Sequence, residues 1–350
     1  MPFRSGFVCI LGRPNAGKST LLNALVGEKL AIISPKPQTT RNRIQGVIHV
    51  PKKKGKGKDG GQIVLVDTPG VHRPDSSLGR KMMVEVREAL EGCDLVLVIM
   101  DVTRKFDPRD QFALDLLKRP RTKAFLVLNK VDLIREKSRL LPLIEQYRKL
   151  YDFSEVVPIS ALKRKGLDSL LEMVIAALPA GPAYFPEDQI TDQPSRFMAA
   201  EIIREQVLLN TSEEIPYATT VMVDNFEEGA RLARIAATIY CERPGQKGIL
   251  VGKGGKMLKK IGTSARLQIE RMLGTKVFLE LYVKAEPGWR DSRRFVEELD
   301  WRRQLEHRMF EQASPAHVAP ENREDNAEKM QERAAQSIRL SDRRGEPTED

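Results

Sequence analysis

The sequence has little cysteine and no long apolar run. Its three cysteines, Cys9, Cys93 and Cys241, lie far apart among 350 residues, and two of them stand within or beside apolar runs. Each fits a small buried apolar side chain better than half of a disulfide, which favours a reducing cytoplasm. The longest apolar stretch, residues 95–100, is far too short to cross a bilayer, since a membrane-spanning helix needs about 20 apolar residues.

Acidic residues are also in short supply. The sequence has 48 of them against 58 lysines and arginines, which gives a net charge of +10. A balance of this sign favours a polyanionic partner, and it does not separate nucleic acid from an anionic membrane surface. The first strand-like run begins at Gly6, so we expect no signal peptide before it. A length of 350 residues predicts two or three domains.

From residue 6 to about residue 178, short apolar runs alternate with amphipathic helical stretches. We expect strands over 6–11, 43–50, 62–67, 94–101, 124–129 and 156–160, and helices near 18–27, 78–91, 108–118, 136–150 and 167–178. This alternation predicts an α/β domain whose mostly parallel sheet is covered by helices on both faces. Ligands of such sheets bind at the carboxyl ends of the strands, so the loops there should carry the function.

The segment Gly12–Ser19, with the sequence GRPNAGKS, follows one of these strands and begins a helix. It has the phosphate-binding pattern G-x-x-x-x-G-K-[ST], in which backbone N–H groups and the helix N-terminus attract an anion. We expect Lys18 to lie between the β- and γ-phosphates of a nucleotide, and the Ser19 hydroxyl to ligate Mg²⁺. A glycine-rich turn that binds nothing is the alternative, and the Lys-Ser pair argues against it.

The segment Asp67–Gly70 follows the strand-like run 63–66 directly. This places Asp67 at a strand end, where its carboxylate can hold Mg²⁺ through water. Gly70 lets its backbone N–H approach a γ-phosphate closely. Taken alone, the segment fits an ordinary turn equally well.

Two further strand ends carry groups that suit a guanine base. Asn129–Asp132 has the sequence NKVD, and Ser160–Leu162 follows the run 156–159. The Asn129 amide can bond N7 and O6 of a purine, and the Asp132 carboxylate can accept from N1–H and the 2-amino group, a donor pair that adenine lacks. Residues 160–162 would add a backbone N–H to O6. Four such segments in this order predict a guanine-nucleotide site.

Residues 12–19, 67–70, 129–132 and 160–162 resemble the G1, G3, G4 and G5 motifs of translation-factor-class GTPases. The resemblance implies a G2 element between residues 30 and 45. Thr40 is then the hydroxyl that reaches Mg²⁺ in the GTP state, with Thr39 as the alternative. The loop 31–41 is expected to be a switch ordered by the γ-phosphate and Mg²⁺, rather than a plain solvated connection.

Val71 stands where many GTPases have the glutamine that orients the attacking water. Asn15 resembles the asparagine that, in GTPases without this glutamine, helps to hold a K⁺ ion near the phosphates, although it could equally cap the turn. His72 is available as a base by position, but a loop histidine is more often solvated. We therefore take Lys18, Thr40 and Asn15 as the candidate catalytic residues.

The expected ligands of this region are GTP or GDP, Mg²⁺ and K⁺. Residues expected to contact the nucleotide are Gly12, Asn15, Ala16, Gly17, Lys18, Ser19, Thr20, Asp67, Gly70, Asn129, Lys130, Asp132, Ser160, Ala161 and Leu162. The expected Mg²⁺ ligands are Ser19, Thr40 and Asp67.

Two segments interrupt the regular pattern. Residues 51–61 hold five lysines and one aspartate between two strands expected to be antiparallel neighbours. We expect a hairpin tip there, which is either a salt-dependent contact with RNA phosphates or a solvated insertion. Residues 179–194 contain four prolines, and we expect them to link a first domain, 1–178, to a second, 195–290.

The second domain has a different order of elements. We expect a helix over 195–209, strands over 219–224 and 235–241, helical turns over 254–273 and a strand over 276–283. The segment Gly252–Gly255 follows a strand-like run at 249–251 and precedes a basic helix. In KH domains a GXXG loop clamps the backbone of about four single-stranded nucleotides, because phosphate can approach positions without side chains. A glycine-rich helix start is the alternative.

Five lysines and no acidic residue lie between residues 247 and 260, which suits a phosphate-binding surface. The expected RNA-binding residues are Gly252, Lys253, Gly254, Gly255, Lys256, Lys259 and Lys260.

With the segments 189–197, 201–204 and 214–217, residues 5–300 closely resemble the Era family of ribosome-assembly GTPases. The resemblance implies a P-loop GTPase domain followed by an α+β KH domain of type II. It also implies GTP hydrolysis, binding to the 3′ end of 16S ribosomal RNA, and a role in assembly and maturation of the small (30S) ribosomal subunit. The expected location is the cytoplasm, with peripheral association at the inner face of the cell membrane as a second location.

Two other functions compete with this one. The first is a nonenzymatic, nucleotide-gated ribosome-binding checkpoint in which slow hydrolysis is incidental, and Val71 favours it. The second is a GTPase that acts on tRNA or membranes and carries a degenerate KH domain. We expect a C-terminal helix and a flexible tail over residues 291–350. The family pattern ends at about residue 300, and beyond it we expect helical stretches at 302–310 and 326–340.

Overall fold

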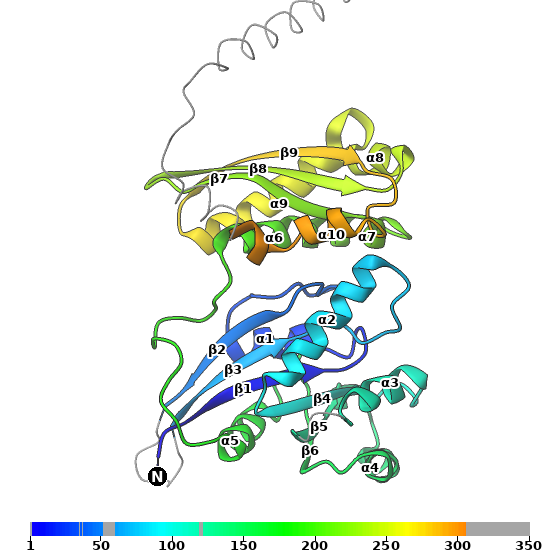
Figure 1. Cartoon of the computed structure of the whole chain (residues 1–350), viewed down its shortest axis with the longest axis vertical. Coiled ribbons are helices and arrows are strands. Elements are labelled where there is room, and N and C mark those ends of the chain that lie inside the picture. Colours follow the sequence, from blue (N-terminus) through cyan, green and yellow to red (C-terminus); the bar gives the residue numbers. More distant parts are fainter. Residues whose placement is uncertain (1, 35, 37, 52–59, 119–121, 306–350) are drawn as a thin grey trace, which may run out of the picture. The chain divides into compact units, whose positions relative to one another are not determined.

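The structure is a computed structural model that describes residues 2–34, 36, 38–51, 60–118 and 122–305. Residues 1–301 form one compact unit, which contains a six-stranded and a three-stranded sheet (Figure 1). Most of the lysine-rich segment 51–61 and most of the C-terminal tail lie outside the described residues.

The larger sheet has the strand order β2-β3-β1-β4-β5-β6. Its strands are β1 (Arg4–Leu11), β2 (Ile44–Val50), β3 (Gly61–Asp67), β4 (Leu95–Asp101), β5 (Lys123–Asn129) and β6 (Glu155–Pro158). Neighbouring strands pair in parallel except β2, which is antiparallel to β3. The mostly parallel sheet is therefore confirmed, and residues 51–60 connect an antiparallel pair as expected.

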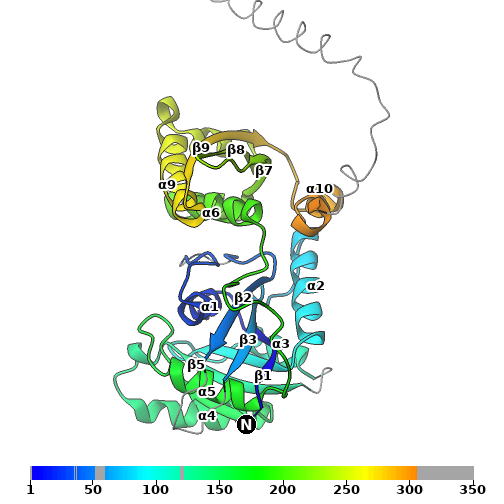
Figure 2. The ribbon, with the colours of Figure 1, turned by 90° about the vertical axis from the view of Figure 1, so that its left-hand side faces the viewer.

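Helices cover both faces of this sheet because its buried strands are apolar on both sides. The helices are α1 (Lys18–Val26), α2 (Ser77–Glu91), α3 (Pro108–Leu116), α4 (Leu140–Leu150) and α5 (Leu167–Ala177), with short 3₁₀ turns η1 (Val131–Leu133) and η2 (Lys137–Arg139). Val8 and Ile10 of β1 face a core shared with α1 and α5. Cys9 and Leu11 face a second core shared with α2, α3 and α4. Figure 2 shows the sheet between α1 and α2.

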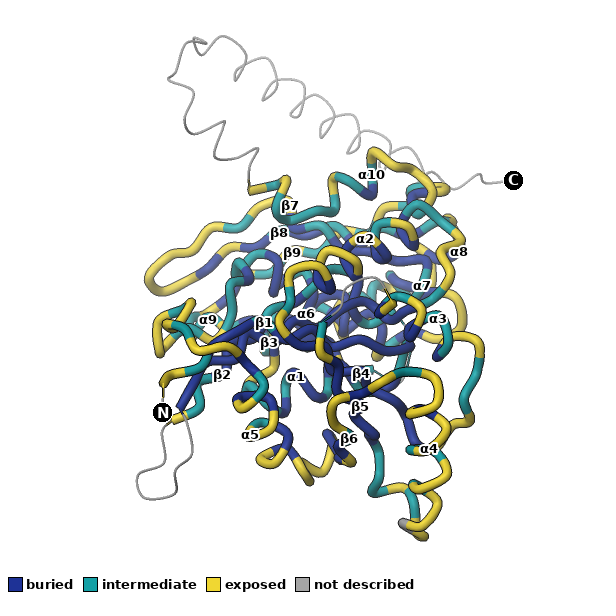
Figure 3. Tube along the Cα trace, turned by 60° about the horizontal axis from the view of Figure 1, so that its bottom comes forward, coloured by how far each residue is buried: buried dark blue, intermediate teal, exposed yellow. Residues whose placement is uncertain are grey.

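The carboxyl ends of the parallel strands meet at one edge of the sheet. The loops after β1, β3, β5 and β6 all leave from this edge, as the sequence predicts. Strands β1, β3 and β5 beneath them are almost completely buried, whereas α4 is mostly exposed (Figure 3). The candidate site is thus carried by loops on a rigid base.

The smaller sheet has the order β7-β8-β9, with β7 and β8 antiparallel and β8 and β9 parallel. Its elements are α6 (Ser195–Asn210), α7 (Ile215–Ala218), β7 (Thr220–Glu227), β8 (Leu232–Cys241), α8 (Pro244–Val251), η3 (Lys253–Gly255), α9 (Lys256–Leu273) and β9 (Lys276–Ala285). α6 and α9 pack on one face of the sheet and share its apolar core. The expectation of a strand-like run at 249–251 is wrong, because these residues end α8.

A short helix, α10 (Arg293–Glu298), follows the second sheet. Its Val296 packs with Trp289 and with Leu78 and Met82 of α2. Residues 301–305 are also helical; the remainder of the expected tail helices lies outside the described residues. α10 thus adds a contact between the end of the second sheet's segment and the first sheet's helices.

All three cysteines are free thiols, as expected. Cys9 and Cys241 are buried, whereas Cys93 is only half-buried. Among the residues that the structure describes, none forms a helix long and apolar enough to cross a membrane.

Candidate functional site

The loop between β1 and α1 has a backbone that only glycine allows at two places. A Cβ on Gly12 would lie 2.5 Å from the carbonyl oxygen of Ile99. Gly17 has φ +102°, and a Cβ there would lie 2.2 Å from the Asn129 amide nitrogen. Asn15 is also left-handed, with φ +63°. The glycines of the sequence pattern are therefore required by close packing around the loop.

Lys18, at the start of α1, is buried inside this loop. Its Nζ donates to the carbonyl oxygens of Gly12 at 3.1 Å and Arg13 at 3.2 Å. Burial lowers the pKa of Lys18, and the nearby Asp67 carboxylate opposes that shift. The ammonium group is thus enclosed by the loop that the sequence assigns to phosphate.

Ser19, Thr40 and Asp67 meet in one buried cluster. The Ser19 hydroxyl donates to Asp67 Oδ2 at 2.7 Å, and Thr40 Oγ1 donates to the same oxygen at 2.9 Å. The two hydroxyl oxygens are 2.9 Å apart. These three residues come from α1, the loop before β2, and the end of β3, so the fold brings together the three expected Mg²⁺ ligands.

The cluster suits a hard divalent cation. Its atoms are all oxygens, which Mg²⁺ prefers, and Asp67 Oδ1 is buried without a hydrogen-bond partner in the structure. Burial raises the pKa of Asp67, while Lys18, Ser19 and Thr40 counteract the rise. A buried carboxylate with one unpaired oxygen gains most from a bound cation. No group of three or more His, Cys, Asp or Glu residues in the described part of the chain offers another metal site.

Asn129 joins two of the candidate loops. Its Nδ2 donates to the carbonyl oxygen of Ala16 at 2.9 Å, and its Oδ1 accepts from the N–H of Ala161 at 3.0 Å. The amide therefore fixes the loop after β1 to the loop after β6. One N–H of its amide group is already used in this contact.

Lys130 is the second support of the loop after β1. Its Nζ donates to the carbonyl oxygen of Asn15 at 2.9 Å and to Asp101 Oδ2 at 2.7 Å. Burial raises the pKa of Asp101, but hydrogen bonds from Lys130 and Thr103 outweigh it and leave that pKa lowered. Asp101 was not among the expected site residues, although its place at the end of β4 is a signal that could have indicated it.

Asp132 lies in η1 and is half-buried. Ser160 is fully buried and pairs with Lys165 through two backbone hydrogen bonds of 3.0 Å, whereas Leu162 is 74% exposed. The Asn129 and Ala161 contact places these loops next to each other at the sheet edge. The expected base-binding segments are thus neighbours in the structure.

Val71 is completely buried and packs in the core with Leu11 and Met83. Its N–H donates to the carbonyl oxygen of Gly12 at 3.1 Å. The side chain therefore points into the protein and cannot orient water. His72 is not the solvated loop histidine that we expected: its Nδ1 donates to the Gly70 carbonyl oxygen at 2.8 Å, and its Nε2 is buried without a partner in the structure.

Sequence reasoning also missed Arg13. This residue of the phosphate-binding loop is 4% exposed, and its guanidinium contacts Asp107 at 2.8 Å and Asp110 at 3.1 Å. Asp107 and Asp110 form the capping box of α3. Arg13 therefore anchors the loop to α3, and a long separation in sequence hid this contact.

The segment Gly252–Gly255 connects α8 to α9 and is an open loop. Gly252, Gly254 and Gly255 all have positive φ, from +60° to +74°. A Cβ on Gly252 would lie 2.7 Å from Cβ of Met257, but nothing lies within 4 Å of a Cβ on Gly254 or Gly255. The backbone at these two positions is open to a ligand. The helix-start alternative is right only in that α9 begins at Lys256.

The lysines expected to bind RNA surround this loop. Lys253, Lys256, Lys259 and Lys260 are all exposed. The first five residues of α9 and the preceding loop therefore present positive charge to solvent. This arrangement matches what a GXXG loop needs for holding a phosphate backbone.

Comparison with known families assigns the class of both halves. The model of a family described as 50S ribosome-binding GTPase matches residues 7–130, and the model of the KH domain matches residues 214–290. The chain is therefore a P-loop GTPase with a C-terminal KH domain, and the α-β-β-α-α-β order from α7 to β9 is that of type II.

Curated relatives are similar over nearly their whole length. GTPase Era of Geobacter metallireducens is 51% identical over 302 residues, which cover 86% of this chain and 98% of the relative. GTPase Era of Ruminiclostridium cellulolyticum is 48% identical over 303 residues, which cover 86% of this chain and 99% of the relative. The chain belongs to the Era family of GTPases.

Two solved Era structures share the fold. One is a variant of Aquifex aeolicus Era bound to GDP and AlF4⁻, with a TM-score of 0.79. The other is Era in complex with MgGDPNP and nucleotides 1506–1542 of 16S ribosomal RNA, with a TM-score of 0.80. Each is 40% identical to this chain and covers 84% of it and 98% of its own length.

Proposed function

We propose that this protein binds and hydrolyses GTP, binds the 3′ end of 16S ribosomal RNA, and acts in assembly and maturation of the small ribosomal subunit. The Ser19, Thr40 and Asp67 cluster carries this proposal, because it is built for the Mg²⁺ of a nucleotide and lies in the same compact unit as an open GXXG loop. A similar Era has been solved with MgGDPNP and 16S ribosomal RNA nucleotides, which supports the choice of RNA.

The nucleotide's phosphates are proposed to lie against the loop after β1. Lys18 supplies a buried positive charge, and the backbone N–H groups around Gly17 supply donors. The remaining contacts assigned to the phosphates are those of Gly12, Asn15, Ala16, Thr20 and Gly70.

Ser19, Thr40 and Asp67 are proposed to hold Mg²⁺. The unpaired Asp67 Oδ1 and the two hydroxyls are the donor set. When bound, the ion supplies charge neutralisation on the phosphate oxygens. Thr40 belongs to the loop 31–41, so this loop is the part of the site that responds to the nucleotide state.

Guanine selectivity is assigned to Asp132, with Asn129, Lys130 and residues 160–162 around it. Asp132 carries the only carboxylate among these residues. The Asn129 side chain accepts a hydrogen bond from the N–H of Ala161 and so fixes the loop that contains it. Adenine would leave the Asp132 acceptors unpaired, which is costly in a site that excludes water.

Hydrolysis must proceed without a glutamine after Gly70, since Val71 is buried in the core. We assign Asn15 as a ligand for K⁺ near the phosphates, which would add positive charge where charge develops in the transition state. Asn15 is half-buried and stands at a left-handed turn of the loop, with φ +63°.

RNA binding is assigned to Gly252, Lys253, Gly254, Gly255, Lys256, Lys259 and Lys260. The unobstructed glycines and the exposed lysines support this choice. We also propose the division into a GTPase domain at 1–178, a linker at 179–194, a KH domain at 195–290 and a C-terminal segment at 291–350. Ribosome assembly would place the protein in the cytoplasm, and association with the inner membrane face stays a prediction.

Crosslinking to cellular RNA in a GTP-locked state tests the partner. Sequencing reads from the crosslinked RNA should accumulate at the 3′ end of 16S ribosomal RNA. If they accumulate on tRNA instead, or if Lys253→Asp leaves RNA affinity unchanged, a degenerate KH domain becomes the better account.

The nonenzymatic checkpoint remains a second candidate because the core position of Val71 leaves the attacking water without its usual partner. Single-turnover hydrolysis, measured with and without K⁺ and with an RNA 3′-end oligonucleotide, separates the two. Stimulation by either addition supports the enzyme, and stimulation by neither supports the checkpoint.

A further inference from the structure

The loop 31–41 is fastened to the KH half of the chain by polar contacts. Lys36 Nζ donates to the carbonyl oxygens of Leu208 and Thr211 at the C-terminal end of α6. The cation there also meets the negative end of the helix dipole. Since Thr40 belongs to this loop, its surroundings depend on residues that lie far in sequence from the segments expected to bind the nucleotide.

Arg204 of α6 is the most deeply buried of these contacts. It is 2% exposed, and its guanidinium makes a bidentate pair with Glu201, at 2.9 and 2.7 Å. The same group donates to the carbonyl oxygens of Gln38, at 3.2 Å, and Thr39. These are the two residues immediately before Thr40. Because Glu201 fixes the planar fork, Arg204 offers the loop a rigid pair of donors.

Arg41 binds on the other side of Thr40. Its guanidinium donates to the carbonyl oxygen of Thr219 at 2.7 Å and lies 5.6 Å from the ring centre of Trp289. Burial, followed by the nearby Arg204 charge, lowers the pKa of Arg41 to about 9. Thr40 is therefore held between two arginine contacts with the KH half, while its own hydroxyl contacts Asp67.

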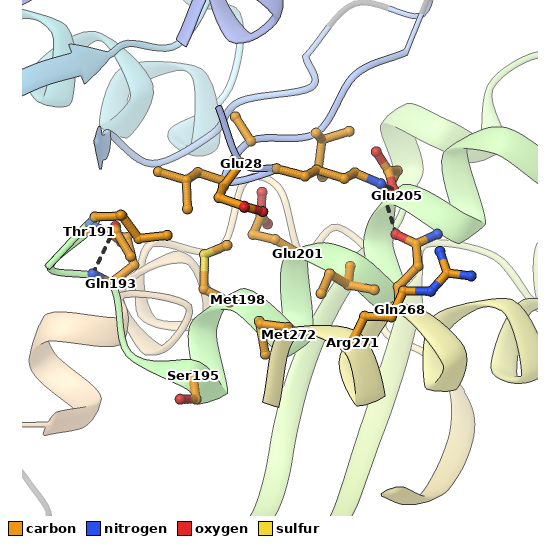
Figure 4. A pocket seen from close by; sticks show the side chains of 16 residues that line it. Glu28, Thr191, Gln193, Ser195, Met198, Glu201, Glu205, Gln268, Arg271 and Met272 are labelled. Atoms are coloured by element: carbon orange, nitrogen blue, oxygen red, sulfur yellow. Dashed lines mark hydrogen bonds and ion pairs between the residues drawn. The ribbon is translucent and has the colours of Figure 1, made fainter. Parts of the chain in front are cut away.

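A cavity of about 870 Å³ lies beside these contacts, between the segment 28–32 and helices α6 and α9 (Figure 4). Lys29 crosses one end, where its Nζ contacts Glu205 and donates to Gln268 Oε1 at 2.8 Å. Leu30 and Met272 are among the apolar lining residues. Ala31, at the start of the loop, belongs to an apolar core that includes Phe197 and Met198 of α6, whereas the contacts around Thr40 are polar.

We propose that Arg204 is a positioning residue for GTP hydrolysis. By holding the carbonyl groups of Gln38 and Thr39, it sets the place of Thr40 at the Mg²⁺ site, so a side chain of the KH half completes the GTPase site. The inference rests on the proposed function and goes beyond it, since it assigns the coupling between the KH half and the GTPase site to one side chain. Coupling of this kind acts in both directions, so the loop also biases the KH half.

The test compares Arg204→Gln with Arg204→Lys and Glu201→Gln in the full chain. Single-turnover GTP hydrolysis is measured across Mg²⁺ concentrations, together with the affinities for GDP and for a GTP analogue. Arg204→Gln should slow hydrolysis by about tenfold or more, as expected for a displaced catalytic group, and should raise the Mg²⁺ concentration needed for half-maximal rate. GDP affinity should change less than affinity for the GTP analogue, and Arg204→Lys should recover part of the rate.

A matched control is Arg196→Gln, also on α6, because Arg196 donates to carbonyl groups of Val223 and Asp224 within the KH half. This variant should keep the Mg²⁺ dependence of the parent. If Arg204→Gln does not fold, as thermal melting would show, Glu201→Gln provides the same test with the arginine retained but its orientation loosened. Parental rates and Mg²⁺ dependence in the folded variants would overturn the proposal. Absence of hydrolysis in the parent would instead overturn the proposed function.

Discussion

The molecule contains two glycine-rich loops that are suited to phosphate, and they are built in opposite ways. The loop at Gly12–Ser19 is enclosed: Lys18 is buried, and added side-chain atoms at Gly12 and Gly17 would collide with neighbours. The loop at Gly252–Gly255 is open, with free space around Gly254 and Gly255 and exposed lysines beside it.

This difference matches the two ligands. An enclosed charge acts at low dielectric and is screened little by salt, which favours one small ligand held in one geometry. An open, basic loop can follow a long polyanion, and its affinity depends on counterion release. Both loops are thus suited to phosphate. The enclosed loop suits selective binding of one small ligand, and the open loop suits binding along an extended polyanion.

Removal of the buried ammonium should have the largest effect. Lys18→Ala leaves the phosphates without their enclosed charge, and we expect a loss of GTP and GDP affinity of about 3–5 kcal/mol, or roughly 10²–10⁴-fold. Calorimetric titration measures it, with RNA affinity of the nucleotide-free protein as the control. A loss that vanishes in high salt would contradict the enclosed character of this loop.

Asp132→Asn should change base selectivity. The amide no longer accepts from two guanine donors, so GTP affinity should fall by about 100-fold while a purine nucleotide with a 2-oxo group should gain. Competition binding with GTP, XTP and ATP measures the order. Tight ATP binding by the parent protein would show that Asp132 does not select guanine.

Gly254→Asp tests the open loop. A carboxylate at a position with φ +60° adds backbone strain and repels phosphate, so RNA affinity should fall by about tenfold or more. Affinity for GTP should stay that of the parent. An equal loss of both affinities would mean that the substitution disturbs more than the KH loop.

Asp101→Asn tests the support of the enclosed loop. Asp101 is almost fully buried beside Lys130, and we expect a loss of about 1–3 kcal/mol of unfolding free energy at neutral pH. Because its pKa is lowered in the folded state, this stability is present above the unfolded pKa of roughly 3.9 and is lost as pH falls through the folded value.

Chemical denaturation of the parent and of Asp101→Asn between pH 3 and pH 7 measures the difference between their unfolding free energies, which should become smaller in acid. Glu286→Gln is the control, since its pair with Lys284 is on the surface and should contribute little. A difference in unfolding free energy that is constant with pH would show that the charge of Asp101 is not what stabilises the fold.

Lys259→Gln combined with Lys260→Gln should give the smallest effect, a fewfold loss of RNA affinity. Each phosphate contact that is lost should reduce the slope of log affinity against log salt by about 0.7 for a single strand. Binding titrations at several salt concentrations give the slope. An unchanged slope would place the RNA away from these lysines.

Local patterns predicted most of the first sheet and its loops, because parallel strands bring their carboxyl ends together wherever the chain alternates strand and helix. Ser19 and Asp67 were predictable as neighbours for that reason, whereas Thr40 was expected only from the resemblance to translation-factor-class GTPases. The run at 249–251 was assigned wrongly because a short apolar segment fits strand and helix equally well.

Arg13 and Arg204 could not be found in this way, whereas Asp101 stands at a strand end that could have indicated it. Each arginine acts through a contact with a segment distant in sequence, and no spacing rule indicates which arginine is buried. Arg204 is 165 positions from Thr39, the residue whose carbonyl it holds. Such contacts follow from the packing of whole elements.

The most direct test of the account compares RNA binding in the two nucleotide states. Affinity for an oligonucleotide of the 16S ribosomal RNA 3′ end is measured with a GTP analogue and Mg²⁺, and again with GDP. Coupling between sites is typically about 1–3 kcal/mol, so we expect binding at least about fivefold tighter with the GTP analogue. Equal affinity in both states would contradict the claim that the enclosed loop controls the open one.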